Sequence, residues 1–469
     1  MEAKKESFRD SISTITEEGL RNWIYPKKPK GRWHTRRVIV AVIMLALFFA
    51  FPLIKINGEQ FMLFDILNRK FVIFGRPFFP QDFYLLAFLL VTGAIFVVLF
   101  TVIYGRIWCG WLCPQTIMME MVYRKVEYWI EGDRPQQMKL DRMPWNKEKI
   151  RKKFTKWFLF FLITLVVTST MWAYVAGTDY VINFWKNPFA KPGVLIAYFI
   201  FATIYYFIYA WFREQVCIIV CPYGRLQGVL TDENTILVTY DYKRGEKRGP
   251  MRKGQDRAAL GLGDCIDCKQ CVHVCPTGID IRNGTQMECI NCTACMDACD
   301  AVMDAIGKPR GLIRYASKRS IEEGTQEIFT PRVKFYTAVL AIILTVFITL
   351  LVKRPTVDLK VLRVRGQVFT ELPDGKIRNY YNATLINKTT HEFKDLSIQV
   401  IDKDGAVITV AGVDDQKPDL KVREIKQMMM FVDFPKGKIE GKEEITFGVF
   451  DQKGKLLDKY KSKFIAPVE

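Results

Sequence analysis

Two runs of four cysteines, between residues 265 and 299, constrain this chain more than any other feature of its sequence. Each run has the spacing C-x2-C-x2-C-x3-C, and proline follows the first run. Three cysteines at this spacing let one tight loop present thiolates to three corners of an iron–sulfur cube, and the fourth reaches the other cube. A zinc site usually needs a longer spacer between its pairs, and a disulfide framework is the other alternative. The spacing therefore predicts two [4Fe–4S] clusters.

The crossed arrangement assigns four ligands to each cluster. The first cluster takes Cys265, Cys268, Cys271 and Cys299, which we call the first quartet. The second cluster takes Cys289, Cys292, Cys295 and Cys275, the second quartet. Asp300 stands where the second run would often carry proline, which weakens the match locally and leaves the ligand count intact.

Five uncharged apolar runs predict that the chain crosses a membrane five times. Each is near the roughly 20 residues that a helix needs to span the hydrocarbon layer. The first run lies too deep in the chain, and lacks the small-residue cleavage site, to be a removed signal peptide. The runs are Val38–Ile54, Phe83–Tyr104, Trp157–Gly177, Pro192–Phe212 and Phe335–Val352.

Lysines and arginines gather on one side of these spans. Residues 1–37 carry ten, residues 105–156 twelve and residues 213–333 seventeen, whereas the loops 55–82 and 177–192 carry four and two. The positive-inside rule predicts a multi-pass protein of the inner (cytoplasmic) membrane, with the N-terminus and the clusters in the cytoplasm and the C-terminal part in the periplasm. The net charge of +19 then faces anionic lipid headgroups, which argues against nucleic acid as a partner.

The distribution of cysteines agrees with this topology. All twelve lie in segments assigned to the cytoplasm or its membrane boundary, and none falls in residues 353–469. An exported domain built on disulfides would show the reverse. The chain contains no Ser-His-Asp set and no nucleotide-binding glycine loop, so we expect any catalysis to come from redox centres.

The second and fourth spans both run into the pattern C-x3-C-P. The copies are Cys109 to Pro114 and Cys217 to Pro222. On a helix, cysteines four apart share one face, and a new helix that starts at the proline directs its positive end towards nearby thiolates. The repetition predicts a two-span unit used twice, with four thiolates at one depth.

Cys109, Cys113, Cys217 and Cys221 are therefore candidate catalytic and metal-binding residues. Together they could hold a third iron–sulfur cluster, or a copper centre, since soft thiolates suit Cu(I). A redox-active dithiol pair and free cysteines packed as small apolar residues are the alternatives. The sequence leaves this choice open because C-x3-C is not a standard cluster spacing.

Histidines are absent from the apolar runs. The three in the chain are His34, His273 and His391. A haem in the bilayer would normally need axial histidines from facing helices, so we expect no haem.

Residues 353–469 change to an alternating apolar and polar pattern, with turn signals such as Pro373-Asp374-Gly375. Several short strands at this spacing predict an antiparallel β-sandwich of immunoglobulin type. The expected strands are Leu359–Val364, Arg378–Ile386, Leu396–Ile401, Ala406–Val410, Val422–Val432 and Glu444–Phe450.

The order of these parts resembles the CcoG family, also called FixG or RdxA, which are accessory proteins of cbb3-type cytochrome c oxidase. The resemblance rests on Cys109–Pro114, Cys217–Pro222, the strip Arg244-Gly245-Glu246 and the eight cysteines of the two quartets. Membrane ferredoxins of quinol-oxidising systems, such as the NapH type, share the C-x3-C-P units and the clusters and lack the outer tail.

The resemblance implies a role in assembling the oxidase, with reduction of Cu(II) to Cu(I); the candidate enzyme activity is thus a cupric reductase. The implied partners are the bilayer, copper, and the subunits of the oxidase or copper-delivery proteins; the sequence does not name the cytoplasmic electron donor. Two other functions stay open. One is a quinol dehydrogenase subunit that feeds a periplasmic reductase, and the other is an assembly scaffold with regulatory clusters.

The expected fold is a membrane α-helical protein with an inserted α+β two-cluster ferredoxin-like domain and a C-terminal all-β immunoglobulin-like sandwich. Five segments follow along the chain: a cytoplasmic lead-in over 1–37, the four-helix membrane region over 38–230, the ferredoxin-like domain over 231–333, the fifth span over 334–352 and the periplasmic domain over 353–469.

Overall fold

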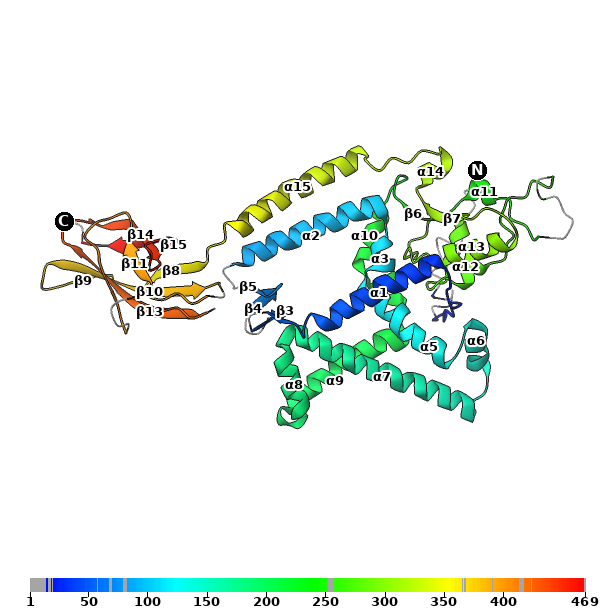
Figure 1. Ribbon diagram of the computed structural model, residues 1–469, viewed down its shortest axis with the longest axis horizontal. Coiled ribbons are helices and arrows are strands. Elements are labelled where there is room, and N and C mark those ends of the chain that lie inside the picture. The colour runs from blue at the N-terminus through cyan, green and yellow to red at the C-terminus, as the bar shows by residue number, and fades with distance from the viewer. Residues whose placement is uncertain are drawn as a thin grey trace. The chain divides into compact units, whose positions relative to one another are not determined.

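The computed structural model forms two compact units, which we describe separately (Figure 1). The first comprises Met1–Gly75 and Leu86–Thr345, and the second comprises Arg76–Leu85 and Val346–Glu469. Part of the expected lead-in over 1–37 falls outside the described residues. The structure describes residues 14–15, 18, 20–56, 58–66, 70–78, 82–251, 257, 259–364, 366, 368–389, 391–412, 417–422 and 424–467.

Five helices are long and apolar enough to cross a membrane, and they coincide with the five apolar runs of the sequence. In the fourth, a π-helical segment, η4, continues α9 without a break. The five are α1 (Arg32–Ala50), α2 (Phe83–Tyr104), α7 (Lys147–Ala176), α9 (Pro192–Phe207) with η4 (Ile208–Phe212), and α15 (Pro331–Val352).

Three of these helices begin earlier than their apolar runs. Helix α1 starts at Arg32, α7 at Lys147 and α15 at Pro331, so each opens with a turn that carries basic residues. Asn146 caps α7, because its side chain accepts a hydrogen bond from the backbone N–H of Lys149 at 2.8 Å. Apolarity marks where a helix enters lipid, whereas caps and ion pairs decide where the helix begins.

Shorter elements connect the long helices of the first unit. Strands β1 and β2 form an antiparallel pair, as do β3 and β4. The connecting elements are β1 (Lys55–Ile56), β2 (Glu59–Gln60), β3 (Met62–Asp65), β4 (Lys70–Ile73), α3 (Ile107–Trp111), α4 (Pro114–Ile117), η2 (Met118–Tyr123), α5 (Arg124–Ile130), α6 (Arg134–Arg142), α8 (Thr178–Lys186), η3 (Pro188–Ala190), η5 (Val216–Val220) and α10 (Pro222–Leu230).

The ferredoxin-like segment follows α10 and closes on itself through the antiparallel pair β6–β7. Its core consists of buried apolar side chains together with the cysteines of both quartets. Its elements are β6 (Leu237–Tyr240), α11 (Tyr242–Gly245), α12 (Gln270–His273), η6 (Ile281–Asn283), α13 (Ala294–Ala305), β7 (Ile313–Ala316) and α14 (Lys318–Glu322).

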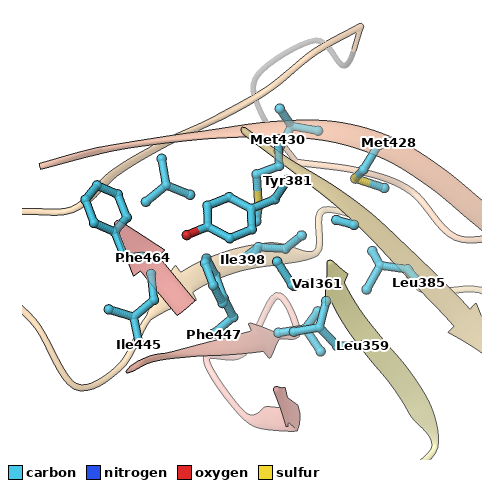
Figure 2. Close-up of a cluster of buried hydrophobic side chains, with 14 of the residues drawn as sticks. Leu359, Val361, Tyr381, Leu385, Ile398, Met428, Met430, Ile445, Phe447 and Phe464 are labelled. Atoms are coloured by element: carbon cyan, nitrogen blue, oxygen red, sulfur yellow. The ribbon is translucent and has the colours of Figure 1, made fainter. Parts of the chain in front are cut away.

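The second unit contains two antiparallel sheets that share one core. One sheet has the order β12-β13-β10-β8, with β9 paired to β10, and the other has the order β11-β14-β15. Side chains from both sheets, such as Tyr381 and Phe447, meet in the core (Figure 2). The strands are β5 (Arg76–Phe78), β8 (Val357–Arg363), β9 (Thr370–Glu371), β10 (Lys376–Asn387), β11 (Ser397–Val400), β12 (Val407–Val410), β13 (Ile425–Pro435), β14 (Lys442–Phe450) and β15 (Leu456–Ile465).

All six strands expected in this region are present, and the structure adds β9 and β15. Strand β15 lies at the edge of its sheet and carries Lys459, Lys461 and Lys463. Lysines on an edge strand prevent pairing with further strands. Because of these lysines, the apolar and polar alternation of the sequence did not indicate β15.

Candidate iron–sulfur and thiolate site

The first quartet gathers around one cavity of the ferredoxin-like segment. Two of its cysteines come from the loop that leads into α12, Cys271 lies in α12 itself, and Cys299 comes from the middle of α13. Tyr240, Lys269 and Arg282 also line the cavity. The four cysteines that line this cavity are Cys265, Cys268, Cys271 and Cys299.

The second quartet lines a separate cavity. Cys275, which ends the first run, joins the three cysteines of the second run there, as the crossed arrangement requires. Cys271 contributes to this wall too, so the two cavities are neighbours. The quartet is Cys275, Cys289, Cys292 and Cys295.

The two cysteine loops have the same backbone conformation. Asp267 and Lys269 of the first loop have φ of 54° and 55°, and Asn291 and Thr293 of the second have φ of 52° and 64°. Positive φ is uncommon in residues other than glycine. Its recurrence at equivalent positions indicates that both loops curl in the same way to direct their thiols inward.

The donor chemistry fits iron–sulfur cubes. Burial, together with the neighbouring thiols of Cys271 and Cys265, raises the pKa of Cys299 to about 12, so a bound metal must displace protons. In the described part of the chain, no three His, Cys, Asp or Glu side chains converge on one ion-sized site. Cysteines spread around a cavity suit the corners of a cube better than a single zinc ion.

The two cavities differ in exposure. Cys268 of the first quartet is exposed to solvent, whereas Cys292 and Cys295 of the second quartet are buried. The first cavity therefore lies nearer to solvent.

Asp300 replaces the expected proline without disturbing the site. Helix α13 continues through this position to Ala305, and the carboxylate accepts a hydrogen bond from the backbone N–H of Gly311 at 2.9 Å. A proline here would break the helix interior, because it lacks the N–H that helical pairing uses.

The two C-x3-C-P units repeat each other in structure as well as in sequence. Cys113 and Cys221 are both extended, and each precedes a helix with proline in its first turn. The N–H of Cys113 donates to Trp108 O at 3.0 Å, and the N–H of Cys221 donates to Val216 O at 2.8 Å. The expectation that both cysteines of a unit share one helical face is wrong, because the second cysteine breaks the helix.

The four C-x3-C-P cysteines are nevertheless brought together from the two units. Burial raises the pKa of Cys217 to about 12, and the thiols of Cys113, Cys109 and Cys221 all add to this rise. Burial likewise raises the pKa of Cys109 to about 11.

The first C-x3-C-P unit packs directly on the loop of the second quartet. A Cβ atom on Gly110 would lie 2.5 Å from Ile290 O and 2.8 Å from Asn291 O, so only glycine fits this contact. Beside it, Trp111 Nε1 donates to the Tyr315 hydroxyl at 3.1 Å. The first C-x3-C-P unit is therefore in direct contact with the loop of the second quartet.

The N-terminal segment also packs on the ferredoxin-like segment, which sequence patterns did not indicate. The side chain of Asp297, in α13, accepts from the backbone N–H of Trp33 at 3.0 Å and of His34 at 2.7 Å. Because Gly31 supplies no side-chain cap, a carboxylate from a distant helix caps α1. The end of the lead-in over 1–37 is therefore attached to the ferredoxin-like segment.

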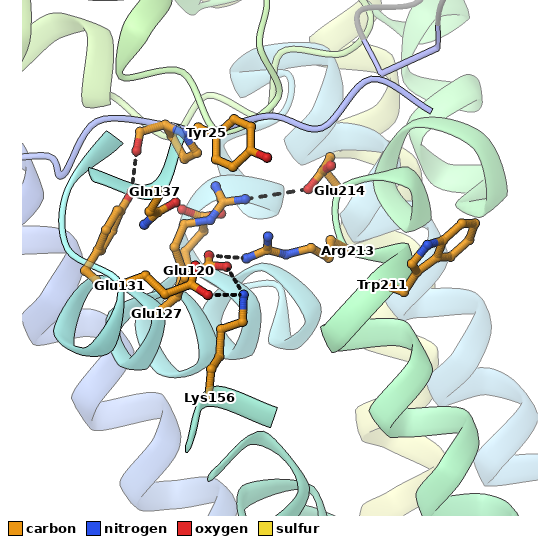
Figure 3. A network of polar contacts seen from close by, with 12 residues as sticks. Tyr25, Glu120, Glu127, Glu131, Gln137, Lys156, Trp211, Arg213 and Glu214 are labelled. Atoms are coloured by element: carbon orange, nitrogen blue, oxygen red, sulfur yellow. Dashed lines mark hydrogen bonds and ion pairs between the residues drawn. The ribbon is translucent and has the colours of Figure 1, made fainter. Parts of the chain in front are cut away.

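A buried network of ion pairs joins the two C-x3-C-P units (Figure 3). Arg213, shortly before Cys217, donates to Glu127 at 2.6 Å. Lys156 of α7 lies 3.3 Å from Glu127 and 2.8 Å from Glu131. The charged residues are scattered along the sequence and did not indicate this network. Its ion pairs connect the two C-x3-C-P units.

The Arg244-Gly245-Glu246 strip supports the first quartet from outside. Arg244 Nε donates to Asp264, the residue before Cys265, at 2.6 Å. The positive charge is therefore held beside the quartet by an ion pair rather than left free. Met118, Met119 and Met121 are buried in apolar clusters.

Three known sequence families match parts of the chain. A 4Fe–4S binding domain matches residues 86–135, a 4Fe–4S dicluster domain matches residues 212–318, and the IG-like fold at the C-terminal of FixG, a putative oxidoreductase, matches residues 347–467. The matched families support iron–sulfur clusters in the first unit and an immunoglobulin-like fold in the second.

Several relatives are similar over most of the chain. Protein RdxA of Cereibacter sphaeroides is 38% identical over 78% of this chain and 79% of its own length, and protein RdxB of the same organism is 37% identical over 83% and 84%. The nitrogen fixation protein FixG of Rhizobium meliloti is 32% identical over 95% of this chain and 93% of its own.

A crystal structure of a FixG-related protein from Vibrio parahaemolyticus aligns with 24% of this chain and 97% of its own, with 19% identity and a TM-score of 0.20. The long relatives, the matched domains and the five apolar helices agree on a membrane iron–sulfur electron-transfer protein. The chain belongs to the FixG/RdxA family.

Proposed function

We propose that this protein passes single electrons from a cytoplasmic donor, through clusters held by the two quartets, to the C-x3-C-P cysteines. There each electron reduces one Cu(II) to Cu(I), which is used in the assembly of a cbb3-type oxidase. Copper is the substrate in this scheme. A redox centre held by the four cysteines would pass the electron on to Cu(II).

One observation carries the proposal: Gly110, between Cys109 and Cys113, abuts the loop that joins Cys289 to Cys292. The three groups of cysteines thus form a continuous series from the exposed Cys268 to the C-x3-C-P cysteines. Clusters bound by the quartets would supply one-electron redox chemistry. The chain itself holds the thiols in place and excludes water from the inner ones.

The orientation of the protein forms part of the proposal. If the five helices cross the membrane, the basic segments and the ferredoxin-like segment fall on the same side of it. Positively charged loops stay in the cytoplasm. The immunoglobulin-like unit is then periplasmic, where oxidase subunits are accessible to it.

The metal at the C-x3-C-P cysteines is proposed to be a third iron–sulfur cluster, with copper as the alternative. The matched 4Fe–4S binding domain over residues 86–135 contains Cys109 and Cys113 and no other cysteine. A cluster there needs two more ligands, and Cys217 and Cys221 come from the equivalent unit and contribute to the same thiol group.

The test is Cu(II) reduction by anaerobically reduced protein. In the Cys113→Ser and Cys221→Ser variants we expect copper reduction to fall at least about ten-fold, while the EPR signals of the two quartet clusters persist. Ser169→Ala, in α7, is the control and should reduce copper at the wild-type rate. Wild-type rates in both cysteine variants would contradict the assignment of these thiols to copper reduction.

A cavity beside Cys289 favours quinol oxidation as the second candidate function. It measures about 170 Å³ and is lined by Arg106, Gln227, Met287 and Asn291 as well as Cys289. Amide and guanidinium groups could bind the two oxygens of a quinol ring. Reduction of the clusters by a menaquinol analogue would support this function, and an unchanged EPR spectrum after mixing would count against it.

A further inference from the structure

Two buried arginines of the first unit have no acidic partner. Arg37 is 4% exposed and Arg106 is 7% exposed, and among the described residues neither makes an ion pair with a carboxylate. Arg37 Nε donates to Gly110 O at 2.6 Å, and its Nη2 has no hydrogen-bond partner among the described groups. Arg106 donates to Gly224 O.

Other buried arginines in the same unit are paired. Arg213 lies 2.6 Å from Glu127, and Arg282 lies 2.6 Å from Asp280 and 2.5 Å from Asp267. A buried charge without a partner is costly, so arginines of this kind are normally paired. The negative charge that balances Arg37 and Arg106 must therefore come from a group other than a described carboxylate.

Both guanidinium groups lie beside the second quartet. Gly110, to which Arg37 donates, abuts Ile290 and Asn291. Ile290 and Asn291 are the two residues between Cys289 and Cys292, so Gly110 connects Arg37 to the loop of the second quartet. Glu120 is held by Arg124 at 2.8 Å.

Arg106 also lies beside the second quartet. It lines the 170 Å³ cavity together with Cys289 and Asn291. Gln227, which lines the same cavity, donates to Cys109 Sγ at 3.6 Å, so this cavity also borders the first C-x3-C-P unit.

The cations beside the first quartet are paired with carboxylates or lie nearer to solvent than Arg37 and Arg106. Arg282 is held by Asp280 and Asp267, and Arg244 is held by Asp264 at 2.6 Å. Two others have no carboxylate partner among the described residues: Arg257, which donates to Cys265 O at 3.0 Å, is half-buried, and Lys269 is exposed. A cube bound by four thiolates is negatively charged, and reduction adds a further negative charge. Unpaired cations therefore favour reduction of a neighbouring cluster, whereas cations already paired with carboxylates have little net effect.

We propose that Arg37 and Arg106 are positioning residues that supply the counter-charge of the second cluster, raise its reduction potential and so draw electrons inward from the first cluster. Burial acts the other way, because low dielectric disfavours the more negative reduced form, and the two cations offset this penalty. The inference rests on the proposed function in one respect only, the presence of a cluster in each quartet.

The test is a potentiometric EPR titration of the full-length protein in detergent. In Arg37→Gln and in Arg106→Gln we expect the reduced-to-oxidised ratio of the second cluster, at a fixed potential, to fall about ten-fold, which is about 59 mV for one electron. Arg37→Lys and Arg106→Lys keep the charge and should restore most of the wild-type ratio. A purely structural role would not be rescued in this way.

Two further variants assign the signals and control for the substitution itself. Arg282→Gln leaves Asp280 and Asp267 unbalanced beside the first quartet, so it should shift the other redox wave. Arg225→Gln, an exposed arginine on α10, should shift neither wave. If Arg37→Gln and Arg106→Gln shift neither wave, or shift the wave that Arg282→Gln shifts, the proposal is overturned.

The iron content of each variant distinguishes a failure of the proposed role of the arginines from an absence of clusters. Clusters present at wild-type content, with unchanged potentials, would contradict the role of the arginines and leave the proposed function intact. Wild-type protein that binds no clusters would contradict the proposed function itself. If Arg37→Gln does not fold, Arg106→Gln carries the test alone.

Discussion

At the scale of single residues, the protein depends on charges that are buried in pairs. Glu127 illustrates this, because burial alone would raise its pKa, yet the charges of Arg213 and Lys156 hold the pKa down at about 2. The carboxylate is therefore ionised at all pH values at which the protein works. The sequence shows these residues only as isolated charges, and their pairing follows from helices that meet far apart along the chain.

Removing this carboxylate should destabilise the protein. Glu127→Gln leaves Arg213 and Lys156 buried with a neutral neighbour, and we expect a loss of about 3–5 kcal/mol in unfolding free energy at neutral pH. Thermal unfolding in detergent measures it. Glu148→Gln is the control, because its pair with Lys152 is exposed, and it should leave the unfolding temperature unchanged.

The pH dependence of this effect has a defined sign. The folded pKa of Glu127, about 2, is below the value of about 4.3 for a free glutamate, so its contribution is complete above the unfolded pKa and is lost as pH falls towards 2. The stability difference between wild type and Glu127→Gln should shrink over this window in metal-free protein. A difference that stays constant from pH 5 to pH 2 would contradict the pairing.

At the scale of elements, sequence patterns predicted most long helices and strands but did not indicate the caps and ion pairs that hold them. Helix α2 spans the residues that the apolar run predicted, Phe83–Tyr104. The start of α1 could not be predicted, because Asp297 caps it from a helix more than two hundred residues away. Periodicity reports which face of an element is buried, whereas caps and ion pairs depend on the tertiary contacts.

The contact between the first C-x3-C-P unit and the second quartet should not tolerate a side chain at Gly110. Gly110→Ala places a methyl group 2.5 Å from a backbone oxygen, so one of the two segments must move. We expect at least about a ten-fold loss in copper reduction, measured by Cu(I) formation. Gly93→Ala in α2, where a Cβ atom meets nothing within 4 Å, should keep full activity. Equal activity of the two variants would refute the tight contact.

Strand β13 offers a matched test of the sandwich core. Met430 is fully buried and its neighbour Met429 is 45% exposed, as alternation along a strand requires. Met430→Ala should cost about 2–5 kcal/mol, and Met429→Ala much less. Urea unfolding of residues 353–469, followed by circular dichroism, measures both. Similar losses in the two variants would contradict the observed register of β13 with β10.

At the scale of the whole molecule, the chain combines a redox unit with an immunoglobulin-like unit that has its own core. The cysteine spacing predicts the composition of both quartets, and the cysteines of each quartet line one cavity. It could not predict that the membrane helices and the ferredoxin-like segment pack as one unit, since this depends on Gly110, Asp297 and the buried ion pairs.

The most direct test of the account is the iron and acid-labile sulfide content of anaerobically purified, full-length protein, together with its EPR spectrum after reduction. Two cubes bound by the quartets give about eight irons per chain, and a third at the C-x3-C-P cysteines gives about twelve. We predict about twelve, falling to about eight in the Cys113→Ser, Cys221→Ser double variant. Wild-type protein with neither iron nor sulfide after reconstitution would contradict the account.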